Sequence, residues 1–287
     1  MLLQILIDGL ILGALYSCIA AGFSLVWGVL NIINLLHGSL IVLGAYLAFF
    51  AYRWLGINPF LFAPVAGLIL FPLGYAIQRL TINGVMGQPV LLTLTLTFGL
   101  NLILDNVLLA AFKADYRRIV LDHSFGLMQL GPIVLPLDRC LAASLALLFI
   151  LCLWLMMRMT RLGRAIVAVR MDAEAATLMG VDVARVYAIT FGLAAAIAGA
   201  TGSLLAAILP ISPLVSSGYL GKAFVICILG GLGSIPGVIV GGLAVGVIEN
   251  LSVLAFGPDH TLTVAFVLLL LLLLFRPTGL FGRRAYQ

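Results

Sequence analysis

The chain has 287 residues, of which 64% are hydrophobic and only 9% are charged, and its formal net charge is +5. A soluble domain carries about 25% charged residues, so this composition excludes a soluble globular protein and indicates that lipid is the solvent. The small positive charge lies mainly in loops, where it reports membrane topology and gives no support to nucleic-acid binding.

Nine apolar runs follow one another along the chain, and a membrane span needs about 20 mostly apolar residues. The runs cover residues 5–29, 40–52, 60–77, 90–112, 138–157, 187–209, 223–232, 238–256 and 261–275. If the seventh and eighth runs are half-spans of one re-entrant unit, the number of spans falls to eight. We therefore predict an all-α polytopic membrane protein with eight to nine transmembrane helices, some broken or re-entrant, in a single transmembrane domain over residues 1–287.

Polar residues interrupt this pattern between the first and second runs, where Asn31, Asn34 and His37 occur close together. At membrane depth such side chains are tolerated only where they face protein or water, so they predict a break between two helices. Two roles fit them equally well. They can line a translocation path, or they can bond the backbone groups that the break leaves free. A second interruption, at residues 210–218, contains two prolines and predicts another break.

Carboxylates and amides also occur inside two of the runs. Thr97, Asn101 and Asp105 are spaced four residues apart, so they share one face of the fourth helix. Asp105 and Glu249 are carboxylates at buried depth, and with Asn101 they are candidates for the translocation path. The structural alternative is that each carboxylate pairs with a basic side chain or stays protonated against a neighbouring span.

Charged residues concentrate in an island between the fifth and sixth runs, at about residues 158–186, which holds five of the fifteen Lys+Arg residues. Asp172 is a good N-cap for a short helix, and Glu174 adds negative charge at the positive end of that helix. Gly180 can adopt the left-handed conformation that ends it, and Asp182 can cap the next helix. The island therefore predicts a short helix set across the chain path between two spans.

Within this island, Glu174, Ala175 and Ala176, followed by Gly180, resemble the EAA motif in the cytoplasmic coupling loop of ABC-importer permeases. Four blocks, in the same order along the chain, resemble branched-chain amino-acid permeases of the LivH type. They are GVLNIINLLHGSLIVLGAY, LGRAIVAVRMDAEAATLMGVDVARV, ILGGLGSIPGVIVGGLAVGVIE and RPTGLFG.

The resemblance implies that Asp172, Glu174, Ala175, Ala176 and Gly180 form a socket for an ATPase subunit. It also implies ABC ATPase subunits, a second permease subunit in a heterodimer, an extracytoplasmic substrate-binding protein, and a lipid setting in the bacterial inner membrane. It leaves the substrate open among branched-chain amino acids, other amino acids, and urea or short amides. No phosphate-binding loop, catalytic triad or metal-ligand spacing is readable, so we expect a transport subunit with no enzyme activity, cofactor or metal of its own.

Two alternatives stand beside this reading. The island can be a helix lying on the membrane surface, although such a helix needs a large apolar face and a basic polar face, and this one carries acids beside its bases. The chain can also be a self-sufficient secondary transporter or channel, for which the face of Thr97, Asn101 and Asp105 would supply ion-coupling groups.

Basic residues in short loops predict the orientation of the chain. With nine spans, the island and the C-terminus are cytoplasmic and the N-terminus is outside. The loop at residues 113–122 would then be outside despite its three basic residues. The other basic residues used for this assignment are Arg79, Arg276, Arg283 and Arg284.

Overall fold

The computed structural model describes residues 2–120, 126–130, 133–257, 260–275 and 279–281. Within these residues, eight helical segments are long and apolar enough to cross a membrane, which confirms the predicted all-α polytopic class. The long helices are α1 (Leu2–Leu30), α2 (His37–Leu55), α3 (Pro59–Leu80), α4 (Val90–Phe112), α5 (Leu137–Met159), α8 (Val183–Ile208), α9 (Ser216–Gly230) and α10 (Ile235–Phe256). Helix α9 reaches the length of a span together with the single 3₁₀ turn before it, as residues Pro213–Gly230. The apolar helix α11 (Thr261–Phe275) follows and is too short to be counted as a span.

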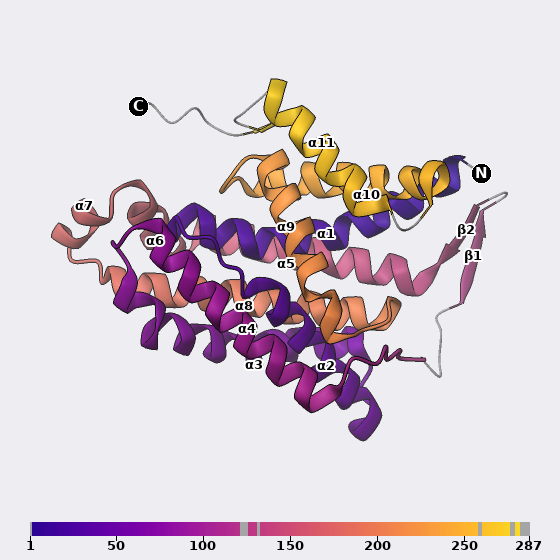
Figure 1. Ribbon diagram of the computed structural model, residues 1–287, viewed down its shortest axis with the longest axis horizontal. Helices are drawn as coiled ribbons and strands as arrows, with labels where there is room; N and C mark the ends of the chain where they lie inside the picture. The colour runs from indigo at the N-terminus through magenta and orange to yellow at the C-terminus, as the bar shows by residue number, and fades with distance from the viewer. Residues whose placement is uncertain (1, 121–125, 131–132, 258–259, 276–278, 282–287) are drawn as a thin grey trace.

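Two pairs of short elements lie at the ends of the bundle. Figure 1 shows α6 (Arg161–Met171) and α7 (Ala173–Leu178) protruding at one end, which we call the α7 end. The antiparallel strands β1 (Leu127–Leu130) and β2 (Ile133–Pro136) lie at the other end beside the start of α1, and we call this the hairpin end. The amide of Gln4 on α1 bonds the backbone of Val134 on β2, which fixes that corner. Two 3₁₀ helices, η1 (Ile82–Val85) and η2 (Pro213–Val215), follow α3 and precede α9, respectively.

Small residues bring the central helices into close contact. The most extensive helix pairs are α3 with α8 and α1 with α10. A Cβ atom added to Gly9 would lie 2.7 Å from Val247 Cα, and one added to Gly13 would lie 2.7 Å from Leu243 Cα. Helices that are embedded in lipid gain no hydrophobic free energy by associating with each other. Close van der Waals packing of their backbones therefore supplies much of the attraction between them.

The predicted break between α1 and α2 is confirmed, and its course is unusual. His37, the first residue of α2, lies with Nε2 2.9 Å from the carbonyl oxygen of Ile19 on α1. Ile19 is eleven residues before the end of α1, a distance of about 16 Å at 1.5 Å per residue. Residues 31–36 therefore run back along α1, and α2 begins beside the middle of that helix.

Helix α9 begins in the same region. The carbonyl of its first residue, Ser216, packs so closely on Gly38 of α2 that no side chain would fit there. From this point α2 runs toward the hairpin end and α9 toward the α7 end (Figure 1). The predicted break holds for residues 210–215 but is wrong for residues 216–218, which form the first turn of α9.

The two ends of the described chain lie at opposite ends of the bundle. Leu2 starts α1 at the hairpin end, whereas the amides of Leu280 and Phe281 donate to the carbonyls of Leu229 and Gly230 at the far end of α9. This arrangement agrees with an odd number of crossings, as in the nine-span alternative, for which basic residues predict a cytoplasmic C-terminus and an outside N-terminus. Three of the basic residues used for that prediction, Arg276, Arg283 and Arg284, lie outside the described residues.

The basic loop at the hairpin end also has a structural use. Arg117 exchanges backbone hydrogen bonds with Ile211, and its guanidinium carbon lies 5.6 Å from the ring centre of Phe49 and 5.7 Å from that of Phe50. Cation–π contacts of this kind hold arginine against aromatic rings. Arg117 is thus held by local packing, and the side of the membrane on which this loop lies stays a prediction.

Candidate functional site

The α6–α7 segment is shaped by side-chain caps that the sequence predicts. Asp172 Oδ1 accepts a hydrogen bond of 2.9 Å from the amide of Ala175, and Asp182 Oδ1 accepts one of 3.0 Å from Arg185. Each bond satisfies an amide that the first turn of a helix leaves free. Thr160 does the same for α6 through the amide of Gly163. The segment is therefore a chain of capped helices rather than a loose linker.

Gly180 reverses the chain after α7, as predicted. Its φ of +82° lies in the left-handed region, and the amide of Val181 donates to the carbonyl of Ala176. This is the bonding of a glycine-terminated helix end. Among the described residues, no atom lies within 4 Å of where a Cβ would be, so only the backbone angle requires glycine here.

The tip of the segment carries exposed apolar side chains. Leu178 is 88% exposed and Met179 is 85% exposed. Among the residues predicted for coupling, Glu174 and Ala175 also face outward, whereas Ala176 is buried against the bundle. Apolar side chains displayed beside charged ones at a protruding tip are typical of a surface that a protein partner covers.

Arg170 connects this segment to the membrane helices. Its Nη1 donates a 2.9 Å hydrogen bond to the carbonyl of Gly233, in the turn between α9 and α10. A Cβ at Gly233, which has a φ of +75°, would lie 2.7 Å from Arg170 Nη2 and 3.1 Å from Gly28 Cα. Glycine at this position therefore lets α6, the end of α1 and the α9–α10 turn meet at one point.

A polar cluster lies where α2 and α9 begin. Ser39 Oγ is 2.7 Å from Asp105 Oδ1 and 2.5 Å from Asn101 Oδ1, and Ser216 Oγ donates to Asp105 Oδ2 at 3.2 Å. The carboxylate thus faces the first turns of two helices, where the helix dipole favours negative charge. In the described part of the chain, the partners of Asp105 are hydroxyl and amide groups, so the basic side chain that one of the two structural alternatives predicted is not found beside it.

The residues of the first break make the backbone contacts expected of a structural role. Asn34 Oδ1 accepts from the amide of Leu36 at 3.1 Å, and buried His37 contacts the Ile19 carbonyl. Asn31 is exposed, with a φ of +54° in the left-handed region. Their predicted role in lining a path stays a prediction.

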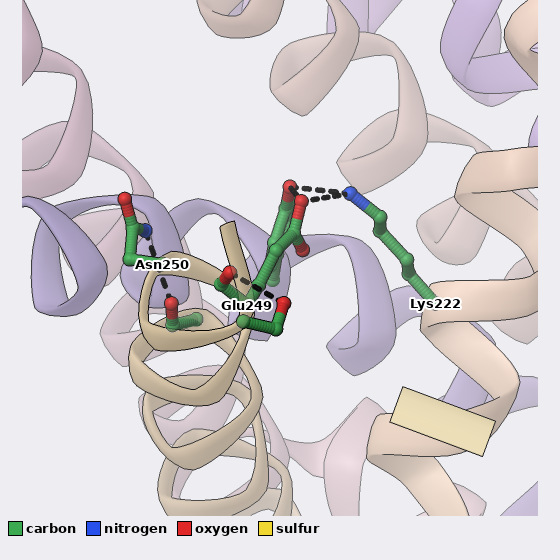
Figure 2. Close-up of polar contacts among 6 residues, drawn as sticks. Lys222, Glu249 and Asn250 are labelled. Atoms are coloured by element: carbon green, nitrogen blue, oxygen red, sulfur yellow. Dashed lines mark hydrogen bonds and ion pairs between the residues drawn. The ribbon is translucent and has the colours of Figure 1, made fainter. Parts of the chain in front are cut away.

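Glu249 lies in a third place, beside a lysine. Glu249 Oε1 is 2.8 Å from Lys222 Nζ and accepts a 3.0 Å hydrogen bond from the hydroxyl of Tyr16. Figure 2 shows Glu249 reaching from α10 toward Lys222 on α9, while Asn250 turns back to its own helix. Lys222 and Glu249 thus form an ion pair. Lys222 is the basic partner that one of the two structural alternatives predicted for Glu249.

With this geometry established, the comparisons with known proteins identify the family. Residues 5–275 match the family described as "Branched-chain amino acid transport system / permease component". The permease protein BraD of Pseudomonas aeruginosa is 33% identical over 98% of this chain and 96% of its own length. LivH of Escherichia coli K12 is 32% identical over 98% of this chain and 96% of its own length. The chain belongs to this permease family.

A second kind of permease is related more distantly. LivM of Escherichia coli K12 is 28% identical over 96% of this chain, which covers 69% of LivM. No solved structure matches the chain. The relatives are named as permeases of branched-chain amino-acid transport systems and not as enzymes, in agreement with the sequence analysis.

Sequence reasoning missed several residues that this permease places at its polar contacts. Ser39 and Ser216 reach Asp105 from positions far away in the chain, and no local pattern marks them. Arg170 was counted only as a charge in the island. Lys222 is one of two lysines in the chain and stands beside an apolar run. A charged side chain at membrane depth is energetically costly, and this feature of the sequence could have identified Lys222 as a candidate.

Proposed function

We propose that this chain is the transmembrane permease subunit of an ATP-binding-cassette importer that moves branched-chain or related amino acids across the bacterial inner membrane. Membership of the permease family and the names of relatives that match nearly the whole chain support the substrate class. The observation that carries the ATP-driven mechanism is the α6–α7 segment. It protrudes from the bundle, exposes an apolar tip and is joined to the α9–α10 turn through Arg170.

In this proposal, ABC ATPase subunits dock on α7, and ATP is hydrolysed on those subunits. A second permease subunit completes the transport unit, and the similarity to both LivH and LivM favours a heterodimer. A substrate-binding protein delivers the amino acid at the hairpin end, which is extracytoplasmic. The α7 end and the C-terminus are cytoplasmic.

The proposed mechanism transmits movement through fixed contacts. Closure of the ATPases displaces α7, and the cap at Asp182 passes that displacement directly into α8. Arg170 passes it to the turn that joins α9 and α10. Because α9 begins against α2 at the Asp105 cluster, a tilt of α9 changes the contact between two helices that start inside the bundle. Access then switches from one side of the membrane to the other.

Replacing Arg170 by glutamine tests this connection. We expect the amount of amino acid transported per ATP hydrolysed to fall about tenfold, because a hydrogen bond from a charged group contributes about 1.5–3 kcal/mol and 1.4 kcal/mol is a factor of ten. Uptake and phosphate release are measured together in proteoliposomes. Arg164→Gln, on the exposed face of the same helix, is the control and should keep the wild-type ratio. An unchanged ratio in Arg170→Gln contradicts the role of this contact.

The function itself is tested by reconstituting the chain with its neighbouring permease, ATPase and binding proteins and measuring uptake of radiolabelled leucine. We expect uptake that requires ATP and every partner. Uptake by this chain alone would instead identify a secondary transporter or channel. Competition by urea or acetamide, with none by valine or isoleucine, would identify an amide permease.

A further inference from the structure

A cavity of about 500 Å³ lies beside the ion pair of Lys222 and Glu249. It is lined by α1, α9, α10, the first residue of α11 and the segment between α8 and α9. Of its α1 residues, Tyr16 lies at the midpoint of that helix and Leu12 lies one turn nearer the hairpin end, so the cavity extends from the middle of the bundle toward the hairpin end. Its volume is within the range of about 300–1,000 Å³ that is common for small-ligand sites.

The walls of this cavity are of two kinds. Leu12, Leu209 and Leu214 give it an apolar side, and the ion pair gives it a polar side. The side chains of Lys222 and Glu249 are only 15% and 13% exposed, so both charges are largely removed from solvent. Lys222 Nζ also lies 2.5 Å from the Tyr16 hydroxyl. A positive and a negative group are thus held close together at one edge of an apolar space.

A second cavity of about 180 Å³ continues toward the hairpin end, and it shares Leu12 and Leu209 with the first. Asp8 and Arg139 both line it, so it too presents a carboxylate and a cation. Asp8 Oδ1 is buried and has no hydrogen-bond partner in the described part of the chain. A buried carboxylate oxygen without a partner is costly, and a ligand ammonium group would relieve that cost.

We propose that the two adjoining cavities form the outer part of the substrate path and that the Lys222–Glu249 pair is a binding site for the zwitterionic head of an α-amino acid. The ligand carboxylate meets Lys222, the ligand ammonium meets Glu249, and the branched side chain lies against the leucines. Because the two protein charges satisfy each other when the site is empty, the site stays neutral and releases its ligand readily, as passage requires.

This inference rests on the proposed function for its substrate class, and it adds the residues that recognise the substrate. The proposed site would also bind amino acids in preference to the uncharged amides. Urea and acetamide carry no charge pair with which to replace the contacts between Lys222 and Glu249. An amino acid replaces both contacts at once and leaves neither protein charge without a partner.

The test removes both charges together, because deleting one alone would leave the other buried and unpaired and would endanger folding. In the double variant Lys222→Met and Glu249→Met, the pair is replaced by apolar side chains of similar length. In the reconstituted transporter we expect leucine uptake at subsaturating concentration to fall by about tenfold or more. The control is Asn106→Leu, which removes an exposed polar group on α4 that bonds only its own helix. Uptake by the double variant equal to that of the control overturns the proposal.

A second measurement does not depend on transport. Photo-leucine, a diazirine analogue of leucine, is activated by light in the presence of the purified transporter, and the labelled peptides are identified by mass spectrometry. We expect label on the segments that contain Leu12, Leu209 or Leu214, reduced by excess leucine and absent from the double variant. Label confined to other segments overturns the proposal. If the wild type labels here but takes up no leucine, the binding site stands and the proposed function fails.

Discussion

Replacing Leu178 and Met179 together by aspartate is expected to abolish capture of the ATPase subunits. These side chains are 88% and 85% exposed at the tip of α7, where no other part of the described chain covers them. If they fill an apolar recess on the ATPase, each change removes a contact and introduces a charge into a dry interface. Buried hot-spot residues of an interface cost about 2 kcal/mol or more when truncated, so with both side chains in that role the double change weakens docking at least about 100-fold.

The measurement is co-purification of the ATPase with the tagged permease complex, followed by its ATP hydrolysis rate. Leu55→Asp is the matched control, because Leu55 is 71% exposed at the C-terminal end of α2, toward the hairpin end. We expect this control to capture the ATPase as the wild type does. Full capture by the α7 variant would place the docking surface elsewhere.

Replacing Gly13 by leucine is expected to produce the largest loss of stability of any single change considered for this bundle. A Cβ atom at Gly13 would lie 2.7 Å from Leu243 Cα, and a backbone atom cannot turn aside as a flexible side chain can. Overpacking costs about 1–3 kcal/mol and occasionally more, and here α1 and α10 must separate. We expect a destabilisation of about 3 kcal/mol.

The free energy of unfolding is measured by titrating the detergent-solubilised permease with sodium dodecyl sulfate. Gly99→Leu is the matched control, because Gly99 lies inside membrane helix α4 with no atom within 4 Å of a Cβ position. Its effect should remain within about 0.5 kcal/mol, as for other open surface sites. Equal effects at Gly13 and Gly99 would contradict close packing of α1 on α10.

Much of this fold could be predicted because its signals are local. Apolar runs give the membrane helices, and residues 90–112 and 261–275 coincide with the bounds of α4 and α11. The caps at Asp172 and Asp182 and the left-handed turn at Gly180 were also predictable. Each depends on a side chain or backbone angle within three or four residues of the group it satisfies.

The remaining features depend on contacts between distant parts of the chain. Residues 31–36 run back along α1 because His37 finds the carbonyl of Ile19, and the sequence shows only that a break is needed there. The partners of Asp105 lie 66 and 111 residues away at Ser39 and Ser216. The strand pair β1–β2 arises inside a loop for which no structure was predicted.

The same distinction between local and distant contacts separates the candidate-site residues that were predicted as a group from those that were not. The coupling residues were predicted as a group because they are neighbours in sequence, and the structure keeps them together at the α7 end. The predicted path residues fall into three separate places, at the first break, at Asp105 and at Glu249. Only the last lines the larger cavity, because Lys222 of α9 and Tyr16 of α1 converge on it there.

The most direct test of the account is a photocrosslink from α7. A benzoylphenylalanine placed at Leu178 in the permease, expressed with its partner subunits in intact cells, is irradiated, and the adducts are identified by mass spectrometry. The account predicts a covalent adduct with the ATPase subunit and none from the same probe placed at Leu55. An adduct from Leu178 with an extracytoplasmic protein or lipid alone, with no ATPase attached, would contradict it.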